Sequence, residues 1–227
     1  MAQFDEKICF VNSNFMTTDN QLQTFIQQAH RAGKERLQLC SSGNLSWRIS
    51  DNTALVSGTG SWLAQLTKEQ VAVCDISTGK HIGGAKPSME SSFHLGVLRE
   101  RPEMNVVLHV QSEYATIVAC MKNKPTNFNV TAEIPCCCGS EIPVVPYYRP
   151  GSPELAEAVI EAMKNHNCIL LNKHGVVVCG KDFDDAFQKA VFFEMACRII
   201  VGAGVDNYLT LTEDEIKDLE IYVLGKK

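Results

Sequence analysis

The chain contains 227 residues, of which 45% are hydrophobic and 21% charged, and its formal net charge is −5. This length is enough to fill one core, so we expect a single domain over residues 1–227. Charges of both signs are scattered without a basic stripe, which argues against nucleic acid or an anionic membrane as the main partner. No apolar run approaches the roughly 20 residues of a spanning helix, and no basic segment with an apolar core begins the chain. We therefore expect a cytoplasmic protein.

The ten cysteines are dispersed along the chain, and several lie inside apolar segments that are typical of strands. Without a secretory signal, this distribution predicts reduced thiols rather than disulfides. The one cluster is Cys136-Cys137-Cys138. Adjacent cysteines lack the two-to-four-residue gap of structural zinc sites, so we interpret the cluster as a tightly packed turn.

The first half of the chain predicts a helix, a group of antiparallel strands, a second helix and a buried strand. The first helix follows the cap candidates Thr17, Thr18 and Asp19, and Pro102 ends the second helix. The expected elements are a helix over 19–37, strands over 45–49, 54–57 and 71–75, a helix over 88–101 and a strand over 106–110.

The second half predicts helices interleaved with short strands. The expected elements are a helix over 112–121, a strand over 141–145, a helix over 152–165, a hairpin of 169–171 with 176–179, a helix over 182–202 and a last helix over 212–224. Thr212 and Glu215 form a capping-box pattern for that last helix. Strict β–α alternation is absent, so we predict an α/β fold with a mainly antiparallel sheet covered by helices.

Three separated polar islands are candidates for a metal site. They are Glu90 after Lys86-Pro87-Ser88, His109-Val110-Gln111 at the end of an apolar run, and His174-Gly175 at a polar break. Residues two apart on a strand share a face, so His109 and Gln111 can address one point. Imidazole nitrogen suits Zn²⁺ and related metals, whereas a neutral amide oxygen is a weaker ligand.

Each of these side chains also has a purely structural interpretation. His109 could be a buried histidine that is bonded to a backbone carbonyl, and His174 could lie at a hairpin surface. Glu90 could serve only to cap its helix and to stabilise the helix dipole. For His94, one turn after Glu90, packing is favoured over metal ligation.

Three further segments have the composition of anion-binding loops. Ser41-Ser42-Gly43-Asn44 and Ser57-Gly58-Thr59-Gly60 combine permissive glycines with hydroxyls or an amide, and Ser88 precedes a predicted helix N-terminus. Each segment alone is only a turn. Together with a metal site, they indicate a phosphorylated substrate.

Seven tracts in order, between about Gln21 and Gly204, resemble the class II aldolase/adducin family. They are Ser42-Gly43-Asn44-Leu45-Ser46, Ser57-Gly58-Thr59-Gly60, Lys86-Pro87-Ser88-Met89-Glu90, Arg101-Pro102, His109-Val110-Gln111-Ser112, Pro150-Gly151-Ser152 and His174-Gly175. The family includes aldolases for L-fuculose 1-phosphate and L-rhamnulose 1-phosphate, and the resemblance is nearest to the fuculose phosphate enzymes. It implies one α/β domain with a core over about 21–204 and helices on both faces of the sheet.

The resemblance implies a divalent metal, usually zinc, held by His109 and His174, with Gln111 standing where the family has a third histidine. Glu90 corresponds to the proton-transfer base, which can also approach the metal. Tyr222 resembles a tyrosine that a neighbouring subunit contributes as proton donor. The family further implies a homotetramer, with the last helix at a subunit interface.

The phosphate-binding positions of the family correspond to Asn44, Thr59, Gly60 and Ser88, although Met89 replaces a serine that is often found there. The implied activity is that of a class II, metal-dependent aldolase. Such an enzyme cleaves a ketose 1-phosphate, such as L-fuculose 1-phosphate, to dihydroxyacetone phosphate and an aldehyde through an enediolate.

Two alternatives remain open from the sequence. Relatives on the same fold act as sugar-phosphate epimerases or dehydratases. A metal-free binding or assembly protein, like the adducin head domain, is suggested by Gln111.

Overall fold

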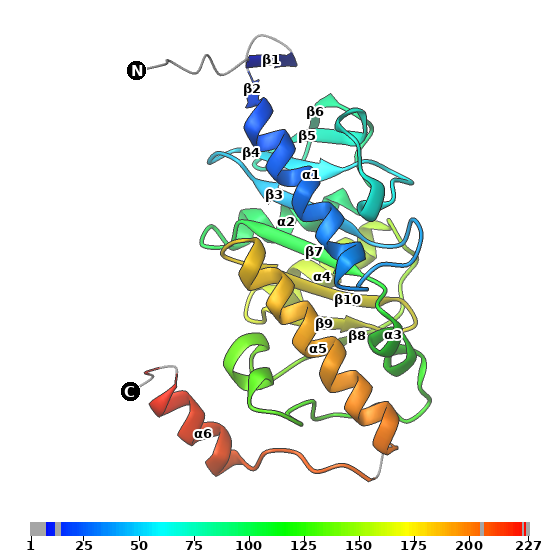
Figure 1. Ribbon diagram of the computed structural model, residues 1–227, viewed down its shortest axis with the longest axis vertical. Helices are drawn as coiled ribbons and strands as arrows, with labels where there is room; N and C mark the ends of the chain where they lie inside the picture. Colours follow the sequence, from blue (N-terminus) through cyan, green and yellow to red (C-terminus); the bar gives the residue numbers. More distant parts are fainter. Residues whose placement is uncertain (1–7, 12–14, 205–206, 224, 226–227) are drawn as a thin grey trace.

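The computed structural model describes residues 8–11, 15–204, 207–223 and 225. Its centre is an eight-stranded sheet in the order β6-β5-β4-β3-β7-β10-β9-β8 (Figure 1). The strands are β3 (Asn44–Arg48), β4 (Thr53–Ser57), β5 (Val71–Asp75), β6 (His81–Gly84), β7 (Val106–Val110), β8 (Val144–Val145), β9 (Cys168–Leu171) and β10 (Gly175–Gly180). Only the β8–β9 pair is parallel, so the predicted mainly antiparallel sheet is confirmed. A separate hairpin pairs β1 (Ile8–Val11) with β2 (Phe15–Thr18).

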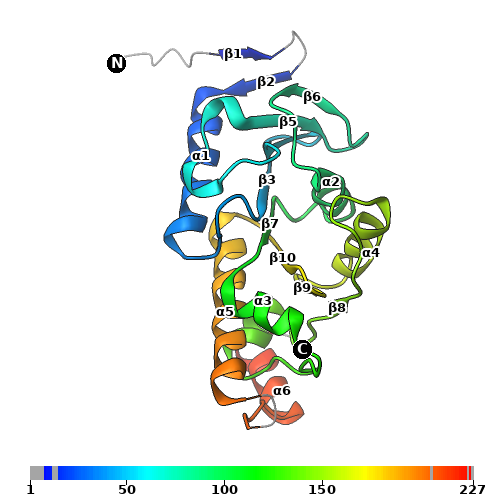
Figure 2. The ribbon, with the colours of Figure 1, turned by 90° about the vertical axis from the view of Figure 1, so that its right-hand side faces the viewer.

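Helices cover both faces of the sheet, as Figure 2 shows. On one face lie α1 (Asp19–Lys34) and α5 (Phe183–Ala203), and on the other lie α2 (Ser91–Glu100) and α4 (Pro153–Met163). Alternate residues of the strands enter two separate apolar cores, one on each face. The shorter α3 (Glu113–Cys120) packs against α5, and α6 (Glu213–Tyr222) lies at one end of the molecule.

The predicted caps form at the helix N-termini. Thr18 and Thr212 each make a capping box, with Gln21 and Glu215 respectively. Ser152 caps α4 by accepting a hydrogen bond from the N–H of Leu155. These local bonds satisfy N–H groups that have no partner within the helix.

Several predicted boundaries are wrong. The strand expected over 141–145 contains only Val144–Val145, because Pro143 has no N–H with which to extend the ladder. The helix expected to begin at Ser88 begins at Ser91, because Pro87 and Ser88 still pair in extended form with the segment of Ser57 and Gly58. The last helix was expected to reach residue 224, which lies outside the described residues.

The cysteine cluster forms a tight turn. Ile134–Cys138 is a single π-helical turn that packs against α5, and the thiol of Cys138 donates to the carbonyl of Lys189 over 3.4 Å. Within the described ranges, no helix is both long and apolar enough to cross a membrane.

Candidate metal and catalytic site

The fold brings the three polar islands of the sequence together. Glu90 is the residue before α2, His109 lies near the end of β7, and His174 lies in the turn between β9 and β10. In the ladder, β7 pairs with both β3 and β10, so His109 stands opposite Asn44 on one side and Val177 on the other. Three segments far apart in the sequence therefore meet at the middle of the sheet.

Two glycines allow the backbone to approach β7 closely. A Cβ on Gly43, whose φ is +84°, would lie 2.6 Å from the carbonyl oxygen of His109. A Cβ on Gly175 would lie 2.4 Å from the carbonyl oxygen of Val110. Any side chain at either position would push its neighbouring loop away from the histidines.

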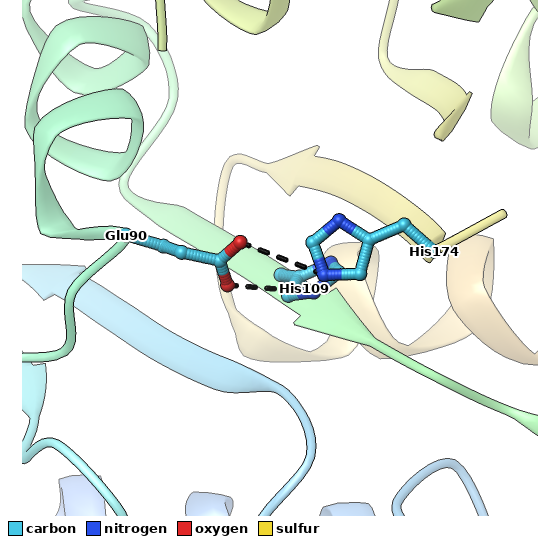
Figure 3. A group of neighbouring side chains, drawn as sticks. All are labelled: Glu90, His109 and His174. Carbon is cyan, nitrogen blue, oxygen red and sulfur yellow. Dashed lines mark ion pairs between the residues drawn. The ribbon is translucent and has the colours of Figure 1, made fainter. Parts of the chain in front are cut away.

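The side chains of Glu90, His109 and His174 converge on one point, as Figure 3 shows. Their ligand atoms lie within 4.8 Å of one another. The Nε2 atom of His109 is 3.5 Å from Glu90 Oε2, and that of His174 is 3.6 Å from Glu90 Oε1. These distances are too long for good hydrogen bonds, but they leave room for an ion between the three groups.

The hydrogen bonds of His109 orient it as a ligand. Its Nδ1–H donates to the carbonyl of Val176 over 3.0 Å, which leaves the lone pair of Nε2 facing the cluster. That Nε2 atom and Glu90 Oε1 are buried and have no hydrogen-bond partner. Histidines that bind metals usually donate their second N–H to a carbonyl in this way. A divalent cation would satisfy both unpaired atoms, so the residues fit the metal that the sequence predicts.

The environment of His174 also favours a neutral ligand. Burial, and less strongly the neighbouring His109, lower the pKa of His174, although Glu90 acts in the opposite direction. A neutral imidazole is the form that binds metal. The surroundings of His174 therefore favour a ring nitrogen with a free lone pair over a protonated one.

Sequence reasoning missed that Ser46 and His94 form a hydrogen-bond network with the site residues. Glu90 makes no capping bond to its helix; its Oε2 accepts a hydrogen bond from Asn44 Nδ2 over 2.9 Å. His94 is fully buried and joins Asn44 to Ser46. The packing expectation for His94 was thus incomplete. A usable signal was present, because Asn44 and Ser46 are two apart on a strand and share a face.

Gln111 follows the last residue of β7, so strand alternation no longer determines its direction. A Cβ on Gly175 would lie 3.1 Å from Gln111 Cγ and 3.3 Å from His109 Cε1. Gln111 therefore packs against the backbone next to His174.

Of the three predicted anion-binding segments, 57–60 and 86–88 lie beside each other, whereas the amide of Asn44 in the third is bonded to Glu90 and His94. The N–H of Thr59 donates to the carbonyl of Lys86 over 3.0 Å, and Gly58 bridges to Pro87. A Cβ on Gly60, whose φ is +71°, would meet nothing within 4 Å, so this loop faces open space. Ser88 is buried directly before the Glu90 segment. The segments of Thr59 and Ser88 are thus joined by backbone hydrogen bonds, and the hydroxyl of Ser88 accepts a hydrogen bond from the N–H of Glu90.

Tyr222 lies near the C-terminal end of α6 and is 80% exposed. Its proposed role depends on a second subunit, and it stays a prediction.

Comparisons with known proteins show which proteins the chain is similar to. The model of the class II aldolase and adducin N-terminal domain matches residues 23–201. The chain is 37% identical to a 3-oxo-tetronate 4-phosphate decarboxylase from Haemophilus influenzae, over 79% of this chain and 86% of that protein. It is 33% identical to an L-fuculose phosphate aldolase from Methanococcus vannielii, over 78% of this chain and 94% of that protein.

Solved structures show the same similarity. The crystal structure of YgbL from Klebsiella pneumoniae superposes with a TM-score of 0.81 and 30% identity, and the match covers 87% of this chain and 96% of that one.

Proposed function

Because this chain belongs to the class II aldolase and adducin family, we propose that it breaks a carbon–carbon bond in a small phosphorylated sugar derivative, with a divalent metal bound by Glu90, His109 and His174. The observation that carries the proposal is that two atoms of this cluster, Glu90 Oε1 and His109 Nε2, are buried without a hydrogen-bond partner. Burying such atoms without a partner costs about 1–3 kcal/mol each. Unpaired atoms of this kind destabilise the folded chain, so a site with only a structural role would not be expected to contain them.

We favour decarboxylation of a 3-oxo sugar acid phosphate as the reaction. Four relatives that are 30–37% identical bear the name 3-oxo-tetronate 4-phosphate decarboxylase. In such a substrate the keto group lies β to the carboxylate, so loss of CO₂ leaves the bonding electron pair on C2 as an enediolate. A proton must then reach C2, which yields dihydroxyacetone phosphate.

The side chains divide this work between them. When bound, the metal acts as a Lewis acid that favours negative charge on the substrate's carbonyl oxygen. We assign the proton transfer to C2 to Glu90, the carboxylate of the cluster, one oxygen of which has no hydrogen bond. We assign the phosphate to the N–H of Gly60 and to the hydroxyl groups of Thr59 and Ser88, because the N–H of Thr59 is already bonded to Lys86.

Aldol cleavage of a ketose 1-phosphate such as L-fuculose 1-phosphate is the second candidate. It is supported by the 33% identity to an L-fuculose phosphate aldolase. Cleavage to dihydroxyacetone phosphate and an aldehyde passes through the same enediolate, and Glu90 would protonate the same carbon. The difference is that aldol cleavage must also remove a proton from the hydroxyl on the aldehyde side. Tyr222 of a neighbouring subunit in a homotetramer would have to supply that group.

The test compares the two substrates on one preparation. Protein purified without chelator is assayed for bound metal, and then incubated with 3-oxo-tetronate 4-phosphate or with L-fuculose 1-phosphate. Both reactions release dihydroxyacetone phosphate, whereas only the first releases CO₂. We expect CO₂ and dihydroxyacetone phosphate in equal amounts, and loss of both after treatment with a chelator.

Two results would contradict the proposal. Failure to form either product despite bound metal would exclude both reactions. Far less than one metal per chain, with no gain on added Zn²⁺, would favour a metal-free binding protein. Light scattering after gel filtration tests the proposed tetramer separately.

A further inference from the structure

A chain of four hydrogen-bonded side chains leads from the sheet to the catalytic carboxylate. Ser46 Oγ is 2.8 Å from His94 Nδ1, His94 Nε2 is 2.5 Å from Asn44 Oδ1, and Asn44 Nδ2 is 2.9 Å from Glu90 Oε2. All four residues are buried. Such a chain can influence Glu90 only if it has one preferred orientation.

The ionised carboxylate of Glu90 determines the orientation of the chain, although the backbone of Val107 is a further hydrogen-bond neighbour of His94. A carboxylate oxygen only accepts, so Asn44 must turn its NH₂ group toward Glu90 and its oxygen toward His94. That oxygen needs a donor, so the proton of neutral His94 is on Nε2. The bare Nδ1 of His94 then accepts the hydroxyl proton of Ser46. Each bond in the chain therefore determines the direction of the next.

The consequence is a difference between the two oxygens of Glu90. Oε2 is bound by Asn44, whereas the buried Oε1 has no hydrogen-bond partner. If Asn44 turned over, its oxygen would face Oε2, and the two acceptors would repel each other. The carboxylate would then rotate, and its distances of 3.5 and 3.6 Å to the two histidines would change.

We propose that His94 and Ser46 are positioning residues, which hold the Asn44 amide in the orientation that fixes the Glu90 carboxylate relative to His109 and His174 and leaves Oε1 unbonded. The catalytic part of this inference rests on the proposed function, whereas the orientation itself does not. Hydrogen-bond partners behind metal-binding groups typically contribute 10–100-fold to metal affinity or activity.

Three variants and a matched control separate this role from simple packing. His94→Phe keeps a ring that can stack on Phe93, whose ring centroid lies 4.7 Å from that of His94, but it removes both hydrogen bonds. His94→Gln restores an N–H donor that reaches about as far as Nε2, and Ser46→Ala removes only the far end of the chain. The control, His30→Phe, removes a 2.9 Å bond from a partly buried histidine outside the site to the carbonyl of Leu66.

The first measurement needs no substrate. In ¹⁵N spectra of histidine-labelled, metal-free protein, wild-type His94 should show a protonated Nε2 and a bare Nδ1. The opposite tautomer would overturn the proposal, whatever reaction the enzyme catalyses.

The second measurement is Zn²⁺ affinity by competition with a chelator, together with kcat and KM on the substrate that wild type turns over. We expect His94→Phe to weaken Zn²⁺ binding and to lower kcat by about 10–100-fold each, with KM nearly unchanged. His94→Gln should recover most of both losses, Ser46→Ala should lose less than His94→Phe, and His30→Phe should lose neither.

The outcomes distinguish the two proposals. If wild type turns over neither substrate, the proposed function fails, but the tautomer and the Zn²⁺ affinities still decide the positioning role. If His94→Phe matches His30→Phe in Zn²⁺ affinity and in kcat per folded molecule, the positioning role is wrong.

Discussion

Two groups of potential metal ligands are buried in this protein, and they differ in what burial does to them. In the first, Glu90, His109 and His174 point their ligand atoms at one another. The second is the thiol cluster of Cys138, Cys168 and Cys197. Its Cys168 thiol is hydrogen-bonded to Cys138, and burial raises the pKa values of Cys168 and Cys197. Thiols held in the protonated form are poor ligands and poor nucleophiles.

The comparison teaches that residue type does not define a site. Among the residues that the structure describes, only Glu90, His109 and His174 form a group with the convergence that a metal needs. The thiol cluster belongs to the apolar core between the sheet and α5, where its sulfurs pack as small hydrophobic groups. The first group has two buried atoms without a hydrogen-bond partner and is expected to bind a metal, whereas burial keeps the second protonated and it is expected only to stabilise the core.

The largest expected effect comes from Glu90→Gln, which keeps the shape of the side chain. We expect kcat to fall by at least ~100-fold, because the proton-transfer group is lost. Metal-free protein should become more stable by about 1 kcal/mol, since the new N–H can donate to a histidine Nε2. Activity assays at saturating metal measure the fall in kcat, and thermal unfolding of the metal-free form measures the gain in stability. Loss of stability with retained activity would mean that Glu90 is structural.

A pH titration probes burial at the same site. Burial, and to a lesser degree the neighbouring His109, lower the pKa of His94 to about 3, whereas a histidine in the unfolded chain titrates near 6.5. Between these values the unfolded state binds a proton that the folded state does not. Stability should therefore fall as pH drops below about 6.5, by up to about 1.4 kcal/mol per pH unit from this group.

Urea unfolding of metal-free protein between pH 7 and pH 4 measures this slope. The variant His94→Gln should remove that contribution. An identical slope in both proteins would show that His94 is not the titrating group.

Gln111→His sharpens the comparison by adding an imidazole beside the first group. If Gln111 is a ligand, Zn²⁺ affinity should rise by about tenfold, or about 1.4 kcal/mol, because imidazole binds zinc more strongly than an amide oxygen. Chelator competition measures the change, and Gln111→Leu serves as the matched control that should weaken binding. Equal affinity in wild type and both variants would place residue 111 outside the metal's coordination.

The smallest effect is expected in the thiol cluster. Cys168→Ala should lower the free energy of unfolding by about 1 kcal/mol, because it removes a fully buried sulfur from a packed core. Metal content and kcat should not change. A loss of bound metal in this variant would show that the buried thiols do bind an ion.

The sequence predicted most elements because their signals are local. The capping box of Thr212 and the Ser152–Pro153 helix start each depend on residues within one turn of helix, and both formed where expected. The strand over 141–145 was shortened because two flanking prolines and a parallel partner, β9, restrict pairing to two residues. The length of such a strand depends on its partner strand, so neighbouring residues in the sequence do not reveal it.

By itself, the sequence determined which chemistry was possible: a carboxylate and two imidazoles, each next to a regular element, with glutamine in place of a further histidine. Only the tertiary structure decided which of these groups meet, because Glu90, His109 and His174 are joined by strand pairing and not by spacing along the chain. It also decided that Glu90 has one bound and one free oxygen. That asymmetry comes from Ser46, His94 and Asn44, whose bonds span about 50 residues and form only when the sheet and α2 pack together.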